Sequence, residues 1–356
     1  MAISSCLLCA ILIAYMVLKK DRDGRRKFIM FGCVLLALQS GLRHLSVGPD
    51  TYAYSLFFKE YVNADWNSVI SALFVDSSEF RDPGFGILVK AFGSIIPDWQ
   101  CFLIATAVLF FFALGRLLYR YVNTTEGVLL AFTLFTGLFN IMTLSAIRQE
   151  ITIALSMMVI PWINDRQWIK ATTVILIGSL IHVSLLFMFV LYPLILFSEK
   201  KLKILYLIAI GFIPFVALFS KSIVGFMVNY MGNDYYACYA EKEGNQGNPI
   251  VYASLCTFLV IYQFFNYKYL EGKPKYHYLV PTAIAMTVFF PLIFLDGSMI
   301  RIGEYFTLYL MISLPLIFEQ VSYKKMAYLA SIIVLVFFIL SKNENYHFFW
   351  ENVPVF

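Results

Sequence analysis

The sequence has few charged residues: only 14% of its 356 residues are Asp, Glu, Lys or Arg, whereas 60% are hydrophobic. A soluble domain needs a charged surface, so this balance excludes that class and is typical of a polytopic membrane protein. The formal net charge is only +5. Basic loops of a membrane protein account for such an excess, so nucleic acid is not an expected partner. The composition predicts an all-α protein with one integral membrane domain over residues 1–356.

Cysteine and histidine are also scarce, with six and four residues. Cys6 and Cys9 have the CxxC spacing, but they lie in an apolar run without a second pair, and we expect them to pack against other residues. No P-loop, HExxH or GxSxG pattern occurs where it could work. No acidic cluster on the predicted outer side has the spacing of metal ligands. We therefore expect no metal and no other cofactor.

Apolar runs long enough to cross a bilayer recur along the chain. At about 20 residues for each span, the length allows ten to thirteen helices. Two runs, 83–97 and 171–197, do not suit a single span and are expected to be re-entrant or broken helices, which need protein or a watery cavity around them. The expected spans are 3–18, 28–45, 101–120, 127–144, 146–164, 204–220, 250–267, 279–295, 302–319 and 325–341.

Basic clusters predict the orientation of these spans. If both irregular runs return to the side on which they start, all basic clusters share one side, which the positive-inside rule makes cytoplasmic. The polar loops 46–82 and 221–249, the segment 296–301 and the tail from residue 342 then lie outside. The clusters are 19–27, 116–120, 166–170, 200–203, 268–275 and 324–325.

Arginine occurs where apolar surroundings make it costly. Arg43, Arg148 and Arg301 lie at ends of apolar runs on the predicted outer side. A cation at a helix centre costs roughly 2.5–3.5 kcal/mol on an insertion scale, so such residues usually face a protein-lined cavity. Guanidinium groups bind phosphate oxygens in pairs and stay charged. Three of them in one outward cavity suggest a bound phosphate or pyrophosphate.

Two of these arginines stand beside other polar residues. Arg148 precedes Gln149 and Glu150 at the start of a helix, and it either snorkels to the interface or serves a polar site. Arg301 and Glu304 are three residues apart on one helix face. That pair either closes on itself as an intrahelical ion pair or orients the arginine for a ligand.

Two further residues are candidates for a polar site. Asp50 precedes a helix expected over 51–61, where it either caps that helix or acts with Arg43. His182 is the only histidine deep in an apolar run. It is either hydrogen-bonded, for example by Ser179 one turn earlier, or functional.

Several short motifs occur in a fixed order between about residues 30 and 320. They are Arg43, then Val47-Gly48-Pro49-Asp50-Thr51-Tyr52-Ala53-Tyr54, Ile147-Arg148-Gln149, Ile181-His182-Val183-Ser184, and Arg301 with Tyr305-Phe306. This ordered set resembles the EpsG family of bacterial exopolysaccharide polymerases, relatives of the Wzy O-antigen polymerases. One departure is Pro49, where the family pattern more often has a small polar residue.

The resemblance implies a GT-C-like helical fold and a membrane glycosyltransferase. Such an enzyme joins undecaprenyl-pyrophosphate-linked oligosaccharide repeat units on the outer face of the bacterial cytoplasmic membrane, for an exopolysaccharide, O-antigen or capsule. The other partners expected are membrane lipid, a chain-length regulator and a flippase. The residues expected to bind pyrophosphate are Arg148, Arg301 and Arg43, and the candidates for a general base are His182, Asp50 and Glu304, in that order.

Two other classes fit the same residues. A flippase or transporter for lipid-linked oligosaccharides would also use arginines for pyrophosphate, but it needs access from both faces of the membrane. A membrane O-antigen ligase or an acyltransferase is the third class. For an acyltransferase, His44 is the sole early histidine available.

Overall fold

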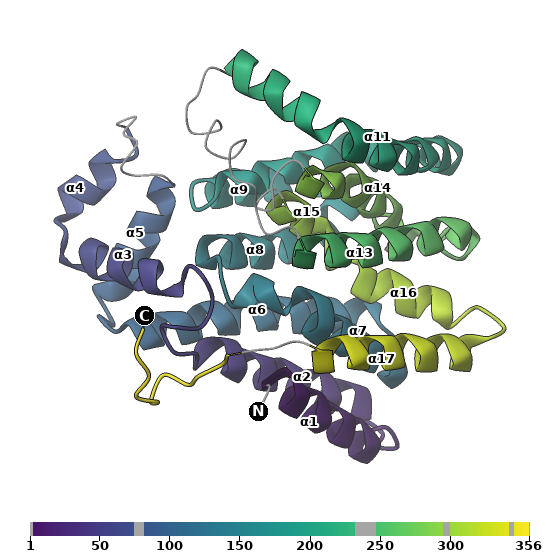
Figure 1. Ribbon diagram of the computed structural model, residues 1–356, viewed down its shortest axis with the longest axis horizontal. Helices are drawn as coiled ribbons and strands as arrows, with labels where there is room; N and C mark the ends of the chain where they lie inside the picture. Colours follow the sequence, from purple (N-terminus) through teal and green to yellow (C-terminus); the bar gives the residue numbers. More distant parts are fainter. Residues whose placement is uncertain (1–2, 75–81, 232–246, 295–299, 342–344, 356) are drawn as a thin grey trace. The chain divides into compact units, whose positions relative to one another are not determined.

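The structure is a computed structural model, and its described part consists of helices and loops (Figure 1). Apart from one isolated β-bridge, between Arg43 and Phe348, the described residues contain no strand pairing. The chain divides into a first unit, Met1–Leu186 with Phe318–Phe356, and a second unit, Phe187–Ile317. The described residues are 3–74, 82–231, 247–294, 300–341 and 345–355.

Among the described residues, five helical segments are long and apolar enough to cross a membrane, which confirms the prediction of an all-α polytopic membrane protein. These segments are Trp99–Tyr121, Thr125–Thr143, Glu199–Phe219, Pro274–Ile293 and Arg301–Phe318. The helices of the first unit are α1 Ile3–Leu18, α2 Gly24–Gly41, α3 Thr51–Asn63, α4 Trp66–Ser71, α5 Pro83–Gly93, α6 Trp99–Tyr121, α7 Thr125–Leu134, α8 Ile147–Asn164, α9 Trp168–Ser179 and α17 Lys324–Ser341.

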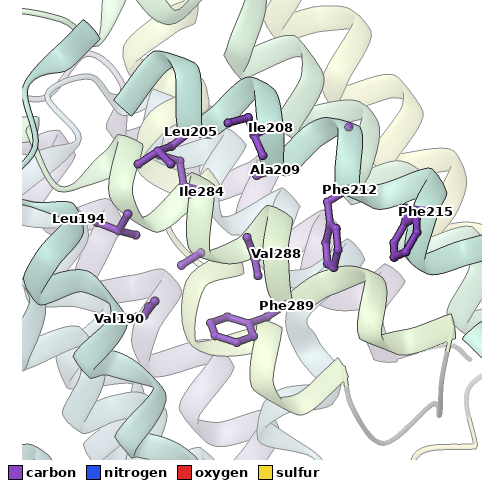
Figure 2. Close-up of a pocket in the computed structure, with 12 residues that line it drawn as sticks. Val190, Leu194, Leu205, Ile208, Ala209, Phe212, Phe215, Ile284, Val288 and Phe289 are labelled. Atoms are coloured by element: carbon purple, nitrogen blue, oxygen red, sulfur yellow. The ribbon is translucent and has the colours of Figure 1, made fainter. Parts of the chain in front are cut away.

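The second unit contains an apolar cavity of about 500 Å³ beside α11 and α14. Figure 2 shows Phe212, Phe215 and Phe289 among its walls, and every side chain that lines it is apolar. A 3₁₀ helix, Val183–Val190, leads into this unit. Its helices are α10 Leu191–Leu194, α11 Glu199–Met231, α13 Gly247–Phe265, α14 Leu279–Phe289, α15 Ile300–Thr307 and α16 Leu310–Phe318.

The two irregular apolar runs differ in outcome. The run 171–197 is broken as predicted, because α9 ends at Ser179 and the next helix begins at Val183. The run 83–97 holds a single helix of 11 residues, α5. The predicted start of the loop 221–249 is wrong, because helix α11 continues to Met231. The rest of that loop up to residue 246 lies outside the described residues.

Helices α2 and α6 pack side by side in opposite directions. At one end Arg25 donates from Nη1 to the carbonyls of Tyr119 and Val122, at 3.0 and 2.8 Å. At the other end Gln100 donates to the carbonyl of Gly41. Since α6 has 23 residues, the two ends lie about 34 Å apart. We call them the Arg25 end and the Gly41 end.

Helix α8 runs parallel to α6, so it begins at the Gly41 end. An ion pair of 3.1 Å between Arg120 and Asp165 joins the finishing residues of α6 and α8 at the Arg25 end. The C-terminal tail also returns to the Gly41 end. There Phe349 donates its N–H to the carbonyl of Leu42, and His44 donates its N–H to the carbonyl of His347, both at 2.9 Å.

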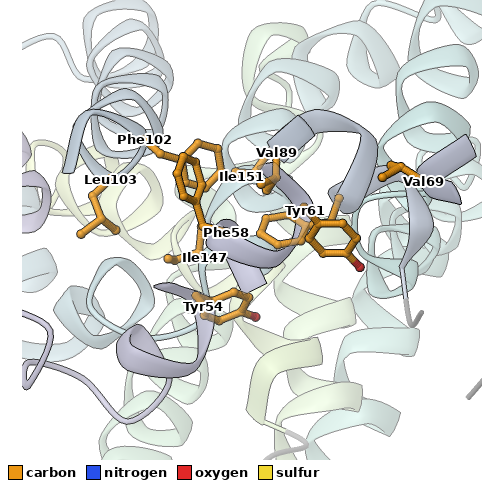
Figure 3. Packing of buried hydrophobic residues seen from close by; sticks show 10 residues of the cluster. Tyr54, Phe58, Tyr61, Val69, Val89, Phe102, Leu103, Ile147 and Ile151 are labelled. Carbon is orange, nitrogen blue, oxygen red and sulfur yellow. The ribbon is translucent and has the colours of Figure 1, made fainter. Parts of the chain in front are cut away.

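Helices α3, α4 and α5 pack on the starts of α6 and α8 through a buried apolar cluster (Figure 3). Burial of each large side chain contributes about 1.5–3 kcal/mol, so the cluster holds this group of helices firmly. Asp98 caps α6 by accepting a hydrogen bond of 2.8 Å from the N–H of Cys101. The members of the cluster are Tyr54, Phe58, Tyr61, Val69, Phe85, Val89, Phe102, Leu103, Ile147 and Ile151.

The turn between α2 and α3 requires a glycine at position 48. Gly48 has a φ of +83°, and a Cβ atom there would lie 1.7 Å from the carbonyl oxygen of Leu144. The turn therefore lies directly on the segment that precedes α8. This contact sets the position of α3 relative to the start of α8.

We expect Gly48→Ala to lower the free energy of unfolding by more than about 2 kcal/mol. Alanine disfavours the positive φ at this position, and its methyl group would collide with the carbonyl oxygen of Leu144. Thermal unfolding of the full chain in detergent measures the change. The matched control is Gly211→Ala in α11, where an added Cβ meets nothing within 4 Å and helix propensity favours alanine. Equal destabilisation by the two substitutions would contradict the prediction.

Candidate functional site

An aspartate at the start of α5 joins two of the sequence-predicted residues. Asp82 Oδ2 lies 2.9 Å from Nη1 of Arg148 and 3.2 Å from Nδ1 of His182. The Asp82 side chain is 8% exposed, whereas those of Arg148 and His182 are 22% and 23% exposed. We call these residues, with Tyr54, the Asp82 site. A nearly buried carboxylate thus holds an arginine and a histidine that both reach the surface.

The local backbone explains how Asp82 reaches His182. Asp82 has a φ of +63°, and Pro83 follows it as the first residue of α5, where proline suits a helix. The N–H of Gly84 donates to the carbonyl of Leu180 at 2.9 Å. A Cβ atom at Gly84 would lie only 2.6 Å from Leu180. The start of α5 is therefore fixed against the end of α9, close to His182.

Arg148 lies in the first turn of α8, between aromatic rings. Its Nε donates to the hydroxyl of Tyr54 at 3.1 Å. Its guanidinium carbon lies 5.4 Å from the ring centre of Tyr54 and 5.7 Å from that of Phe85, a cation–π arrangement. Because these contacts come from the protein itself, Arg148 is not placed as a snorkelling side chain. Its guanidinium plane is fixed by an acid, a hydroxyl and two rings.

His182 follows α9 in the break of the apolar run. The alternative that Ser179 satisfies this histidine is wrong, because the hydrogen bond of the His182 ring is to Asp82 and the Ser179 hydroxyl donates to the carbonyl of Leu176 at 2.8 Å. The ring instead meets Asp82 through Nδ1. A carboxylate at Nδ1 favours the tautomer with its proton on that nitrogen. In that tautomer Nε2 carries the lone pair and can accept a proton.

The pKa of Asp82 is lowered from its ordinary value. Burial alone would raise this pKa, but the hydrogen bond with His182 and the charges of His182 and Arg148 outweigh it. The residue lies in the turn before α5, outside the candidate membrane spans. Asp82 is therefore an anion at neutral pH, as its two contacts require.

Arg43 lies in a different environment, fully buried at 0% exposure. Its Nη1 donates to the carbonyls of Ser40 and Thr143, at 2.7 and 2.9 Å, and its Nε donates to Oγ1 of Thr51 at 3.3 Å. Glu150, in the first turn of α8, is buried as well. Arg43 therefore ties together the end of α2, the start of α3 and the turn before α8.

Asp50 occupies the N-cap position of α3, but its side chain makes no capping hydrogen bond. Of the two alternatives for Asp50, a helix cap or a partner of Arg43, the first is therefore wrong. Its Oδ2 instead accepts a hydrogen bond of 3.2 Å from the hydroxyl of Ser145. Gly48 causes this difference, since it brings the turn before α3 against the segment before α8.

Arg301 and Glu304 belong to the second unit. Both lie on α15, which confirms the predicted helix, and Glu304 is 6% exposed. The Asp82 site belongs to the first unit. That Arg301 and Glu304 lie in one cavity with it therefore stays a prediction. Residues 296–299 of the predicted outer segment 296–301 lie outside the described residues.

Asp82 was missed by the sequence analysis. A signal for it existed in the dipeptide Asp82-Pro83, which stands directly before a short apolar run. An aspartate followed by proline is typical of a helix start. The pattern indicates the turn. It does not indicate that Arg148 and His182, which are 66 and 100 positions further along the chain, share the carboxylate.

The described residues contain no group of three His, Cys, Asp or Glu side chains placed to hold a metal ion. The expectation that no cofactor is needed is not tested by this finding and stays a prediction. Neither Cys6 nor Cys9 forms a disulfide with another described residue, and both are exposed.

The chain matches a known protein family. The family model described as the EpsG family matches residues 26–350, which covers the Asp82 site, Arg43 and Arg301. No curated protein and no solved structure matches the chain.

We expect acid to remove the stabilising effect of Asp82. A carboxylate whose pKa is lowered on folding stabilises the protein above its ordinary pKa, about 3.9, and this contribution is lost as the pH falls through the lower folded value. The unfolding temperatures of the wild type and Asp82→Asn should therefore differ most above pH of about 5, and the difference should shrink steadily as the pH falls below about 4. Thermal unfolding between pH 3 and 7 measures this. A difference that stays constant over this range would contradict the assigned ion pairs.

Proposed function

Because the chain belongs to the EpsG family, we propose that it is a membrane glycosyltransferase that joins undecaprenyl-pyrophosphate-linked oligosaccharide repeat units into a polysaccharide. Membership of this family supports a function of the polysaccharide polymerase type in a membrane. The observation that carries the specific proposal is the Asp82 site, where one carboxylate holds an arginine and a histidine near the surface.

In this proposal the histidine acts as the general base. The hydroxyl of the acceptor sugar attacks the anomeric carbon of the donor, and Nε2 of His182 takes its proton. The new carbon–oxygen bond forms as the bond between the anomeric carbon and the pyrophosphate oxygen breaks. Asp82, held at Nδ1, orients the ring and stabilises the imidazolium that results. The proton then leaves to the pyrophosphate or to water.

Arg148 stabilises the leaving pyrophosphate. Its guanidinium carries five N–H donors in a rigid plane, and Tyr54 and Asp82 fix that plane. A preorganised cation needs no rearrangement when charge develops on the leaving group. Arg301 is proposed as a second ligand, brought to the same pyrophosphate from α15.

The net charge of the Asp82 site changes in step with the reaction. Before proton transfer, the charges of Asp82 and Arg148 cancel and His182 is neutral. After transfer, the site carries one positive charge, at the moment when the pyrophosphate gains negative charge. A site that is neutral with the substrate and positive with the leaving group favours the transition state over the ground state.

Arg43 is proposed to position this site, although it was first expected to bind pyrophosphate. It is fully buried, and its donors hold two backbone carbonyls and Thr51. Asp50 and Glu304 remain alternative bases, less favoured because Asp50 accepts from Ser145 and Glu304 is 6% exposed.

We place the Gly41 end on the outer face of the cytoplasmic membrane. The opposite end of the first unit carries the basic residues before α2 and at the end of α6, and the positive-inside rule assigns such residues to the cytoplasm. The Asp82 site would then meet lipid-linked repeat units after a flippase delivers them. A chain-length regulator is a further partner for such a polymerase.

We expect Arg148→Lys to reduce polymer formation about 100-fold or more, because lysine keeps the charge but loses the planar fork. Purified protein with lipid-linked repeat units, followed by gel analysis of product length, measures this. The matched control is Arg120→Lys, which alters an exposed ion pair at the Arg25 end and should leave activity unchanged. Normal product from Arg148→Lys would exclude the leaving-group role.

His182→Gln and Asp82→Asn should affect the rate non-additively. His182→Gln should lower the turnover number about 100-fold, the effect of losing a positioned base. Asp82→Asn should lower it at least as much, because it disturbs both contacts of the carboxylate. The double variant should then be no slower than Asp82→Asn alone. Multiplied losses in single-turnover measurements would show that the two residues act independently.

Cells that lack the protein separate a polymerase from a flippase. Loss of a polymerase should leave single repeat units on lipid carriers at the outer face, where an impermeant sugar-oxidising reagent labels them. Labelling only after the cells are opened would place the units inside. That outcome would favour a flippase over the proposed polymerase.

A further inference from the structure

A long groove lies between α2 and α6, with a volume of about 670 Å³. Each helix contributes one stripe of side chains with the spacing of a single helix face, from Arg26 to Ala37 and from Val108 to Tyr119. Between these helices, Cys33 lies against Gly115, where an added Cβ would be 3.0 Å from its sulfur. This close packing closes the floor of the groove, which is therefore open only towards its surroundings.

The walls of the groove are apolar along most of their length. Met30 and Val34 of α2 and Val108 and Phe112 of α6 line it, and all four are more than half exposed. In a membrane such walls face lipid chains. The groove is thus suited to a hydrocarbon chain that lies parallel to both helices.

Two arginines stand together at one end of this apolar groove. Since α2 and α6 are antiparallel, Arg26 at the start of α2 and Arg116 near the finish of α6 both lie at the Arg25 end. Both are exposed and line the groove. Within the described chain, neither has a hydrogen bond or an ion pair with another residue. Their neighbours Arg25 and Arg120 are instead bonded to protein groups.

The length of the groove matches one half of a bilayer. Each stripe covers 11 residue steps, which correspond to about 16 Å of helix. The hydrocarbon core of a bilayer is about 30 Å thick, so one leaflet is about half of that. A molecule with its charged group at the arginines would have its chain end near the middle of the membrane.

We propose that this groove binds an anionic glycerophospholipid of the leaflet at the Arg25 end. The phosphate lies between Arg26 and Arg116, which offer charge-assisted hydrogen bonds to its oxygens. One acyl chain fills the groove along Val34 and Phe112. The site lies at the end of the first unit opposite the Asp82 site, so it is separate from the proposed chemistry and does not depend on it.

Titration of the full chain in detergent with phosphatidylglycerol or phosphatidylcholine, followed by native mass spectrometry, tests the proposal. The wild type should bind one phosphatidylglycerol at least about tenfold more tightly than phosphatidylcholine. Arg26→Gln with Arg116→Gln should lower the affinity for phosphatidylglycerol about tenfold and leave phosphatidylcholine binding unchanged, because only the charged contacts are lost. The matched control is Lys20→Gln with Arg22→Gln, which removes the same charge outside the groove and should change neither affinity.

A second variant tests the chain-binding part. Val34→Trp fills the groove from an exposed position and should weaken binding of phosphatidylglycerol, whereas Val17→Trp, on an exposed face of α1, should not. Equal binding by the wild type and the double arginine variant would overturn the proposal, as would an equal loss in the charge-matched control. Displacement of phosphatidylglycerol by a lower concentration of a polyprenyl phosphate would also overturn it, since the groove would then belong to the lipid carrier. Each outcome is a binding result and is independent of polymer formation.

Discussion

The arrangement at the Gly41 end depends on one carboxylate. Asp82 accepts from Arg148 and contacts His182 through a single oxygen, and it comes from a segment that neither partner shares. If the carboxylate were removed, a guanidinium among aromatic rings would lose its counter-ion, which is costly wherever solvent is limited. The starts of α5 and α8 and the end of α9 must therefore converge within hydrogen-bonding distance. The fold achieves this through backbone contacts, notably that of Gly84 with Leu180, so the ion pairs need not do so alone.

A second cation secures the scaffold on which that site rests. Arg43 is fully buried, and its Nε and Nη1 donate hydrogen bonds to one hydroxyl and two carbonyl oxygens. A buried guanidinium is tolerated only with such partners, so its contacts specify how α2, α3 and the turn before α8 meet. Tyr54, which fixes Arg148, is carried by α3. One arginine thus orders the helices and another faces the surface, although both stand at ends of apolar runs in the sequence.

Hydropathy predicted most of the helices. An apolar run in lipid must satisfy its backbone hydrogen bonds within the segment, and a helix does so. Hydropathy also predicted the break near His182. It did not predict the partners of polar residues, since those depend on which distant segments meet. Asp50 shows the difference clearly. Its position before α3 followed from local rules, but its partner, Ser145, follows from the contact of Gly48 with the turn before α8. Asp82 was missed for the same reason, because nothing near it in the chain indicates Arg148.

The arginines of the first unit differ in whether the protein itself supplies their hydrogen-bond acceptors. Arg25, Arg43, Arg120 and Arg148 each contact protein acceptors. Arg26 and Arg116 have none within the described chain and stand at the end of an apolar groove. Water can satisfy a guanidinium at a membrane surface. Two guanidiniums at the end of an apolar groove also suit a phospholipid, whose phosphate would contact the arginines and whose acyl chain would fill the groove. The same side chain therefore serves as a structural tie, a candidate catalytic cation and a lipid contact, and the distinction lies in whether the fold supplies the anion or leaves it to a ligand.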